Sequence, residues 1–391
     1  MDISLYFEPV NISNVFDDEQ SHPNQIGNSI LIYGKDNPFP SLDGIDIAFL
    51  GVNESRVAIG NAGCKNAPDQ VRKYFYPLFK HNNGIKIADL GNIKPGNSIN
   101  DTYFALRDIT ANLLKQNVIP IIVGGSQDLT YANYLAYESI GRIINLVCVD
   151  MAFDLGDIES PMTSKTYLSK IITHQPSYLF NYSNIGYQTY FVDAGAVDLM
   201  KKLFFDVYRL GLVQTDIEEV EPMVRNADML SVDLSAVRQS DAPGNGCATP
   251  NGFYGEELCR IMRYAGMSDK LTSVGLYEIN PEYDRNGQTA GLAAQAIWYF
   301  IDGFYNRKQD FPIKDKKFYI KYRVAIKELQ DEIIFYKSKK TNRWWMEVPC
   351  PTRLKSKYER HYLVPCSYSD YQTALKEAVP DRWWQAYQKI M

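Results

Sequence analysis

Short apolar runs alternate, along most of the chain, with stretches in which apolar residues recur every three or four positions. The apolar runs have no polar face, which is typical of strands that are buried on both sides of a parallel sheet. These strands are expected at residues 45–52, 118–125, 143–150, 188–193, 227–234 and 271–279. Helical patterns lie between them, including residues 100–116 and 286–304. The alternation predicts a three-layer α/β domain with a mainly parallel sheet, ending near residue 306.

Polar side chains directly follow four of the apolar runs. They are Ser126, Gln127 and Asp128; Asp150 and Asp154; Asp233 and Ser235; and Glu278. Any one group is explained equally well by a helix cap or a turn. Ligands bind at the carboxyl ends of strands in open parallel sheets, so four such groups together predict a pocket.

Composition narrows the possible partners. The 391 residues carry a net charge of −5 and no dense basic arm, so we expect no nucleic-acid partner. The N-terminus does not resemble a signal peptide, and no apolar segment reaches membrane-spanning length, so we expect no membrane insertion. The six cysteines are scattered without CxxC spacing, which favours reduced thiols and a cytoplasmic protein.

The composition changes past residue 306. Residues 307–391 contain RWW twice, at 343–345 and 382–384, among many tyrosines and basic residues. Residues 331–338 are expected to form a strand, and residues 368–391 a short helix, a proline break and an aromatic terminal helix. Buried tryptophans would make this extension a packed cap, whereas exposed ones would make it a docking surface. We expect a packed cap that also contributes to a protein partner's interface or to self-association.

Six segments carry a resemblance to a known family. They read GNAGCKNAPDQVRKYF (60–75), DLG (89–91), GGSQD (124–128), DMAFD (150–154), SVDLSAVRQ (231–239) and YEINPEYDRNGQTAG (277–291). In this order they resemble the ureohydrolase family of arginase, agmatinase and formimidoylglutamase. The resemblance covers roughly residues 44–306 and implies an arginase-like α/β domain with about eight parallel strands. It leaves residues 1–43 as an N-terminal segment and residues 307–391 as the extension. Family members commonly form trimers or hexamers, so the resemblance leaves the oligomeric state of this chain open.

The resemblance also implies a metal centre that is incomplete here. In the family, two manganese ions share a bridging hydroxide that attacks a guanidino or formimino carbon. One ion's ligands would map to Gln127, Asp150, Asp154 and Asp233, with Gln127 in place of a histidine. The other ion's ligands would map to Ala152, Asp150, Asp233 and Ser235, where a methyl group and a hydroxyl replace a histidine and an aspartate. We therefore expect at most one residual ion, held by the first set.

Two further residues have expected roles in this pocket. Glu278 lies where the family places the acid that meets the cationic head of the substrate. Arg238 replaces a family carboxylate, and its guanidinium is expected to neutralise the three aspartates. Of the four histidines, only His174 lies near the region that borders the family's pocket, and a lone histidine there is more often not a ligand.

These features support three functions. The sequence favours a catalytically degenerate ureohydrolase-fold protein (a pseudoenzyme) that acts in binding or assembly, with no cofactor. The alternative is a divergent, formimidoylglutamase-like hydrolase of linear amidines with one Mn, Mg or Ca ion, because hard cations suit an all-oxygen ligand set. A third possibility is a sensor in which Glu278 binds a cationic amidine or guanidine.

Overall fold

The central sheet of the computed structural model, which describes residues 2–16, 21–81, 84–312, 316–327 and 331–391, is mainly parallel. Its strands are β1 (Phe7–Glu8), β2 (Leu31–Ile32), β3 (Ile47–Val52), β4 (Ile87–Ile93), β5 (Ile119–Gly124), β6 (Ile144–Val149), β7 (Leu179–Tyr187), β8 (Asp206–Arg209), β9 (Met229–Asp233) and β10 (Ser273–Tyr277). They follow the order β1-β4-β3-β5-β10-β9-β6-β7-β8, and β2 pairs with β4. Only β1 runs antiparallel to its neighbour among the described strands of this sheet. The predicted arginase-like α/β fold is confirmed.

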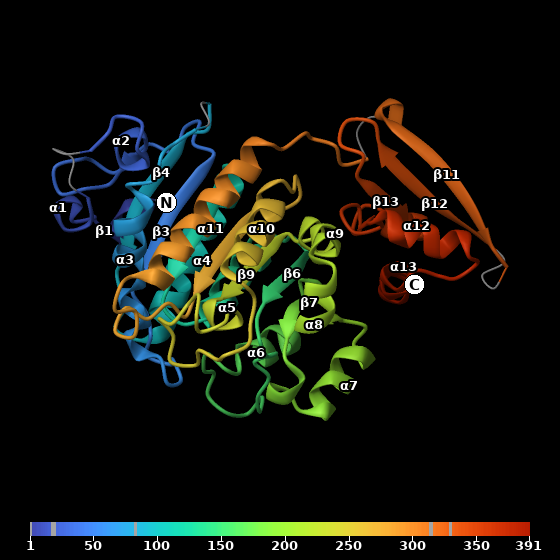
Figure 1. Cartoon of the computed structure of the whole chain (residues 1–391), viewed down its shortest axis with the longest axis horizontal. Helices are drawn as coiled ribbons and strands as arrows, with labels where there is room; N and C mark the ends of the chain where they lie inside the picture. The colour runs from blue at the N-terminus through green and yellow to red at the C-terminus, as the bar shows by residue number, and fades with distance from the viewer. Residues whose placement is uncertain (1, 17–20, 82–83, 313–315, 328–330) are drawn as a thin grey trace.

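Helices cover both faces of this sheet (Figure 1). They are α1 (Ile12–Val15), α2 (Ile26–Ser29), α3 (Ala67–Phe75), α4 (Ile99–Lys115), α5 (Leu129–Ser139), α6 (Tyr167–Thr173), α7 (Ala194–Lys202), α8 (Leu210–Thr215), α9 (Val220–Arg225), α10 (Gly255–Gly266) and α11 (Gln288–Tyr305). α3, α10 and α11 share one apolar core with the sheet, and α4 packs on the opposite face. Helix α4 begins at a capping box, in which Ser98 Oγ accepts from the backbone N–H of Asp101 and the Asp101 carboxylate accepts from that of Ser98.

Five of the six expected strands and both expected helices are confirmed, but the strand expected at 188–193 is wrong. There the chain makes a short 3-10 turn, and Tyr190 and Phe191 are exposed rather than packed in a core. The true strand is β7, just upstream. Its apolar pattern is interrupted by Asn181, Ser183 and Asn184, whose buried side chains find polar partners. Because those partners come from elsewhere in the chain, local hydrophobicity does not reveal β7.

The extension forms a separate antiparallel sheet beside the α/β domain (Figure 1). Its strands are β11 (Tyr319–Ile326), β12 (Asp331–Ser338), β13 (Trp344–Glu347) and β14 (Leu363–Cys366), and its helices are α12 (Tyr368–Leu375) and α13 (Asp381–Ile390). The expected strand at 331–338 and the helix, proline break and terminal helix are confirmed. Trp344, Trp345 and Trp383 are buried in this unit, as a packed cap requires, whereas Trp384 is exposed. The division of the chain at residues 44 and 307 stays a prediction.

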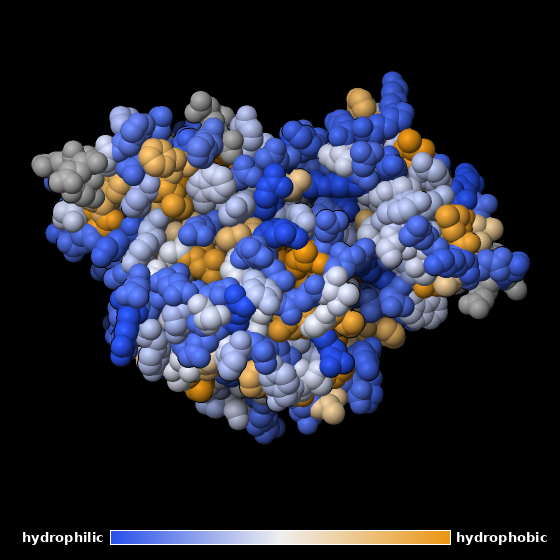
Figure 2. Space-filling view, viewed as in Figure 1, coloured by the Kyte–Doolittle hydropathy of each residue, from blue (hydrophilic) through white to orange (hydrophobic). Residues whose placement is uncertain are grey.

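The surface visible in Figure 2 is mainly hydrophilic, with apolar side chains in small, separate groups. Such scattered exposure is ordinary for a globular protein. Among the described residues, no helix combines the length and the apolar character needed to cross a bilayer.

Candidate functional site

Three aspartates meet at the carboxyl ends of two neighbouring strands. Asp150 directly follows β6, Asp154 lies in the loop beyond it, and Asp233 ends β9. Carboxylate oxygens of the three residues all lie within 4.8 Å of one another, and all three side chains are buried. The carboxylates are held from behind: Asp150 Oδ1 accepts from the N–H of Ala152 (3.0 Å), and Asp233 Oδ1 accepts from the N–H of Ser235 (2.7 Å). These bonds leave the other oxygen of each carboxylate for a cation.

Several buried oxygens near these strand ends have no hydrogen-bond donor among the described residues. They are Asp150 Oδ2, Asp154 Oδ2, Gln127 Oε1 and Ser235 Oγ. Gln127 is fully buried just after β5, and its amide nitrogen lies 3.3 Å from Ser231 Oγ, so its amide oxygen is the free end. A buried oxygen without a donor costs free energy unless a cation or water meets it. The free oxygens of Asp150 and Asp154, within the cluster of three aspartates, therefore suit a cation, although the ligand roles stay predictions.

Glu278 lies at the end of β10, next to the same pocket. Its backbone adopts φ 65°, a left-handed conformation that is uncommon for a glutamate, and its side chain is 2% exposed. Glu278 Oε1 accepts from the N–H of Gln127 (2.9 Å), and Oε2 accepts from Asn61 Nδ2 (2.7 Å). Asn61 was not among the expected site residues, although it belongs to the Gly-rich segment at 60–75. Its side chain fixes the Glu278 carboxylate across a large separation in sequence.

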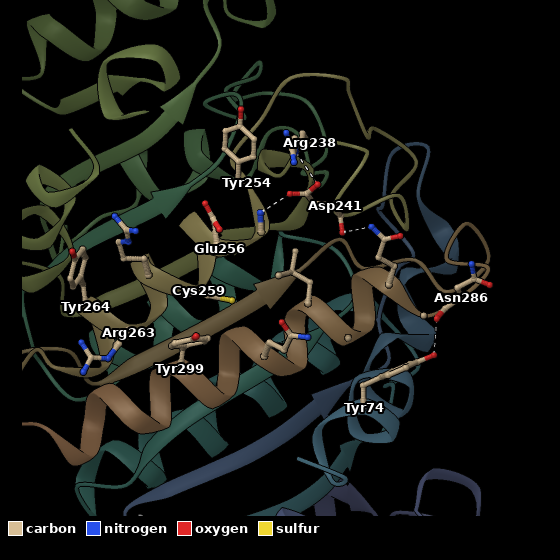
Figure 3. Close-up of a pocket in the computed structure, with 17 residues that line it drawn as sticks. Tyr74, Arg238, Asp241, Tyr254, Glu256, Cys259, Arg263, Tyr264, Asn286 and Tyr299 are labelled. Atoms are coloured by element: carbon tan, nitrogen blue, oxygen red, sulfur yellow. Dashed lines mark hydrogen bonds and ion pairs between the residues drawn. The ribbon is translucent and has the colours of Figure 1, made fainter. Parts of the chain in front are cut away.

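The cation of the aspartate cluster is Lys165, not Arg238. Lys165 Nζ lies 3.3 Å from Asp233 Oδ2 and 3.7 Å from Asp154 Oδ1. Arg238 instead lines a separate cavity of about 1050 Å³ beside α10 and α11 (Figure 3). There its Nε pairs with Asp241 (2.9 Å) and its guanidinium lies 3.8 Å from the centre of the Tyr254 ring. The expectation for Arg238 fails because Asp241, three residues away, is a nearer carboxylate partner.

Burial and mutual repulsion shift the pKa values in this pocket. Burial, together with the charges of Asp154 and Asp233, raises the pKa of Asp150 well above its usual range. Burial raises the pKa of Asp154 to about 6, with Lys165 acting in the opposite direction. Burial and the Asp233 charge raise the pKa of Glu278 to about 8. Burial opposes the charged form of Lys165, but the surrounding carboxylates outweigh it and raise its pKa. The pocket thus carries more negative charge than one ammonium compensates.

His174 lies outside the cluster, as expected for a lone histidine. Its Nε2 lies 3.0 Å from Glu138 Oε2, and its ring packs edge-on against Tyr131 and Tyr134. Among the described residues, the group of carboxylate, thiol and imidazole ligands close enough to share an ion consists of the three aspartates alone. No imidazole replaces those missing from the family pattern.

Proteins similar in sequence to this chain include formimidoylglutamases. The protein of that name from Staphylococcus haemolyticus is 25% identical over 250 residues, which cover 62% of this chain and 80% of that protein. The one from Staphylococcus aureus strain bovine RF122 is 25% identical over 268 residues, covering 66% of this chain and 86% of that protein. These matches leave about a third of this chain unaligned.

Solved structures with the same fold include formimidoylglutamase from Bacillus subtilis, at a TM-score of 0.65 and 19% identity, covering 75% of this chain and 95% of that one. Formiminoglutamase from Trypanosoma cruzi, solved with manganese, matches at a TM-score of 0.64 and 19% identity, covering 68% of this chain and 96% of that one. The Arginase family model matches residues 45–302, well over half of the chain. With the strand-end carboxylates and the sheet order described above, this match identifies the chain as a member of the arginase family.

Proposed function

We propose that this chain is a divergent, metal-dependent hydrolase of C–N bonds in linear amidines that works with a single ion. The comparisons favour this alternative over the catalytically degenerate protein that the sequence favoured, because the similar proteins include formimidoylglutamases. The observation that carries the proposal is the convergence of three buried carboxylates with oxygens that lack a donor. A protein that had no use for a cation would gain stability by replacing these groups with apolar ones.

The donor set suits one ion and not two. Asp150, Asp154, Asp233 and Gln127 offer four oxygen ligands, which favour Mn²⁺, Mg²⁺ or Ca²⁺ over softer metals. A second ion would depend on Ala152 and Ser235, which supply a methyl group and a neutral hydroxyl. When bound, a single cation would polarise a water or the substrate's C–N carbon.

The protein's own contribution is to hold and orient the substrate. An amidinium group carries N–H donors in a plane, which match the two oxygens of one carboxylate. Glu278 is fixed by Asn61 and by the backbone of Gln127, so its carboxylate cannot turn away from the pocket. A cationic substrate beside Glu278 would favour the ionised carboxylate, which burial alone disfavours.

A second candidate function is binding or assembly without catalysis. It is favoured by Ala152, by Ser235 and by the ammonium of Lys165 inside the aspartate cluster. One cation among three carboxylates acidifies water less than two cations that share it. The exposed Trp384 of α13 would then be a first place to look for a protein partner.

One set of measurements separates the two candidates. Purified protein is loaded with Mn²⁺, Mg²⁺ or Ca²⁺, its metal content is measured, and turnover of formiminoglutamate, agmatine and arginine is followed by release of formamide or urea. The hydrolase proposal expects one ion per chain, and turnover that is lost in Asp154→Asn and kept in Asp157→Asn, a change in the exposed part of the same loop. No turnover at full metal occupancy would reject the hydrolase and leave the binding protein.

A further inference from the structure

Lys165 reaches the aspartate cluster from a loop that is tied down on both sides. The N–H of Ser164 donates to Val57 O (3.1 Å), and the N–H of Ile59 donates to Ser164 Oγ (3.1 Å). The N–H of Thr163 donates to Thr166 Oγ1 (2.8 Å), closing a turn directly before α6. Because these hydrogen bonds fix the backbone on both sides of Lys165, the fold itself directs this side chain toward the aspartates.

The ammonium of Lys165 contacts the carboxylates of two of the ligands that an ion would need. Asp154 and Asp233 both belong to the single ligand set that the structure retains, and both are paired with Lys165 Nζ. A metal ion bonds carboxylate oxygens at about 2.0–2.6 Å, so it cannot share them with an ammonium at hydrogen-bond distance without strong repulsion. The side chain of Lys165 is 26% exposed, so a path remains along which it can withdraw to solvent.

We propose that Lys165 is a tethered cation that occupies the residual metal position, and that a divalent ion binds only by displacing it. This inference rests on the one-ion site of the proposed function. It assigns a role to the lysine that neither the metal-ligand pattern nor the fold requires. The charge of Lys165 lowers the affinity for the ion, and it also stabilises the three aspartates when no ion is bound.

If Lys165 both competes with the ion and stabilises the ion-free aspartates, then removing its charge should strengthen metal binding and weaken the metal-free protein. Lys165→Met keeps the unbranched side chain up to the position of Cε and removes the ammonium and its charge. We expect Mn²⁺ to bind this variant at least about tenfold more tightly, which corresponds to about 1.4 kcal/mol, because no cation has to leave. In a chelator the same variant should melt at a lower temperature than the wild type, because three buried carboxylates lose their counterion. Added Mn²⁺ should then raise its melting temperature more than that of the wild type.

Two matched variants isolate the charge at this position. Lys165→Arg keeps a cation and should retain the wild-type metal affinity. Lys170→Met removes a partly buried lysine of α6 whose Nζ contacts a backbone oxygen, and it should change neither property. Lys165→Gln, which is polar and uncharged, serves as a second neutral variant if Lys165→Met does not fold.

Calorimetric titration with Mn²⁺ and thermal melts in chelator decide the outcome. Tighter binding by the neutral variants supports the inference, including the case in which the wild type binds no measurable ion. Equal or weaker binding by the neutral variants overturns it. Failure of the proposed function has a different signature, because it shows as absent turnover at full metal occupancy, whatever the relative affinities.

Discussion

Arg225 joins the α/β domain to the extension, and its removal should destabilise the whole chain. The guanidinium lies at the end of α9 and is 4% exposed. It donates two hydrogen bonds to Trp344 O (3.1 Å each) and one to Cys366 O (3.2 Å), and it stacks 4.4 Å from the centre of the Trp345 ring. Arg225 therefore connects α9 to two neighbouring strands of the second sheet.

The size of the effect follows from these contacts. A hydrogen bond from a charged donor contributes about 1.5–3 kcal/mol, and a buried cation–π contact about 1–2 kcal/mol. The two carbonyls would stay buried without a donor in Arg225→Ala, while Glu221 would keep Arg343 as a partner at 3.0 Å. The contacts share one guanidinium, so their contributions do not add, and we expect the free energy of unfolding to fall by about 3–5 kcal/mol, the range for removing one partner of a buried charged pair.

Urea unfolding monitored by tryptophan fluorescence tests this value, with limited proteolysis reporting release of residues 307–391. Arg323→Ala is the matched control, because its ion pair with Glu332 lies within the extension and is largely exposed. That control should change the free energy of unfolding by less than about 0.5 kcal/mol. A loss below about 1 kcal/mol in Arg225→Ala would show that the two units are joined by apolar packing rather than by this arginine.

Three further changes test other parts of the structure. The double variant Ala152→His with Ser235→Asp restores the two ligands that the second ion lacks. Metal analysis should then show the metal content rise from one ion per chain to two. Unchanged metal content would mean that the pocket has closed around the smaller side chains. Burial holds the pKa of His361 at about 3 against an ordinary 6.5, so at this residue the unfolded chain takes up a proton before the folded chain does. The contribution of His361 to stability should therefore fall as the pH drops below 6.5, by up to about 1.4 kcal/mol per pH unit, whereas the buried carboxylates with raised pKa values act in the opposite direction. Urea titrations should show the free energy of unfolding of the wild type falling relative to that of His361→Gln over this pH range, and a constant difference would contradict the prediction. A Cβ at Gly125 would lie 1.5 Å from the carbonyl oxygen of Glu54. Thermal unfolding of Gly125→Ala should therefore show a loss of more than about 3 kcal/mol in the free energy of unfolding. A free energy of unfolding close to that of the wild type would mean that the strand ends can separate.

The fold was predictable where a strand is covered on both faces and its buried residues are mostly apolar, because such a strand leaves a continuous apolar run in the sequence. Strands β3, β5, β6, β9 and β10 are of this kind, and each was expected within a few residues of its bounds. Strands β4 and β8 were not expected. β4 contains Asp89, whose buried carboxylate is paired by Arg72, and β8 is only partly buried. Polar groups inside a strand mask its pattern when their partners are distant in sequence.

Site residues, like the strands, were predictable only where the signal lies in the local sequence. The aspartates and Glu278 were predictable because each directly follows or ends an apolar strand, and parallel strands bring such ends together. Lys165 carried no such signal, since it stands in an ordinary polar loop and its partners lie in two other segments. Charge balance called for a cation near three buried carboxylates, and Arg238 was the candidate because it replaces a family carboxylate just after the strand that ends in Asp233. The sequence shows that clustered carboxylates need a counterion, but only the tertiary structure decides which residue supplies it.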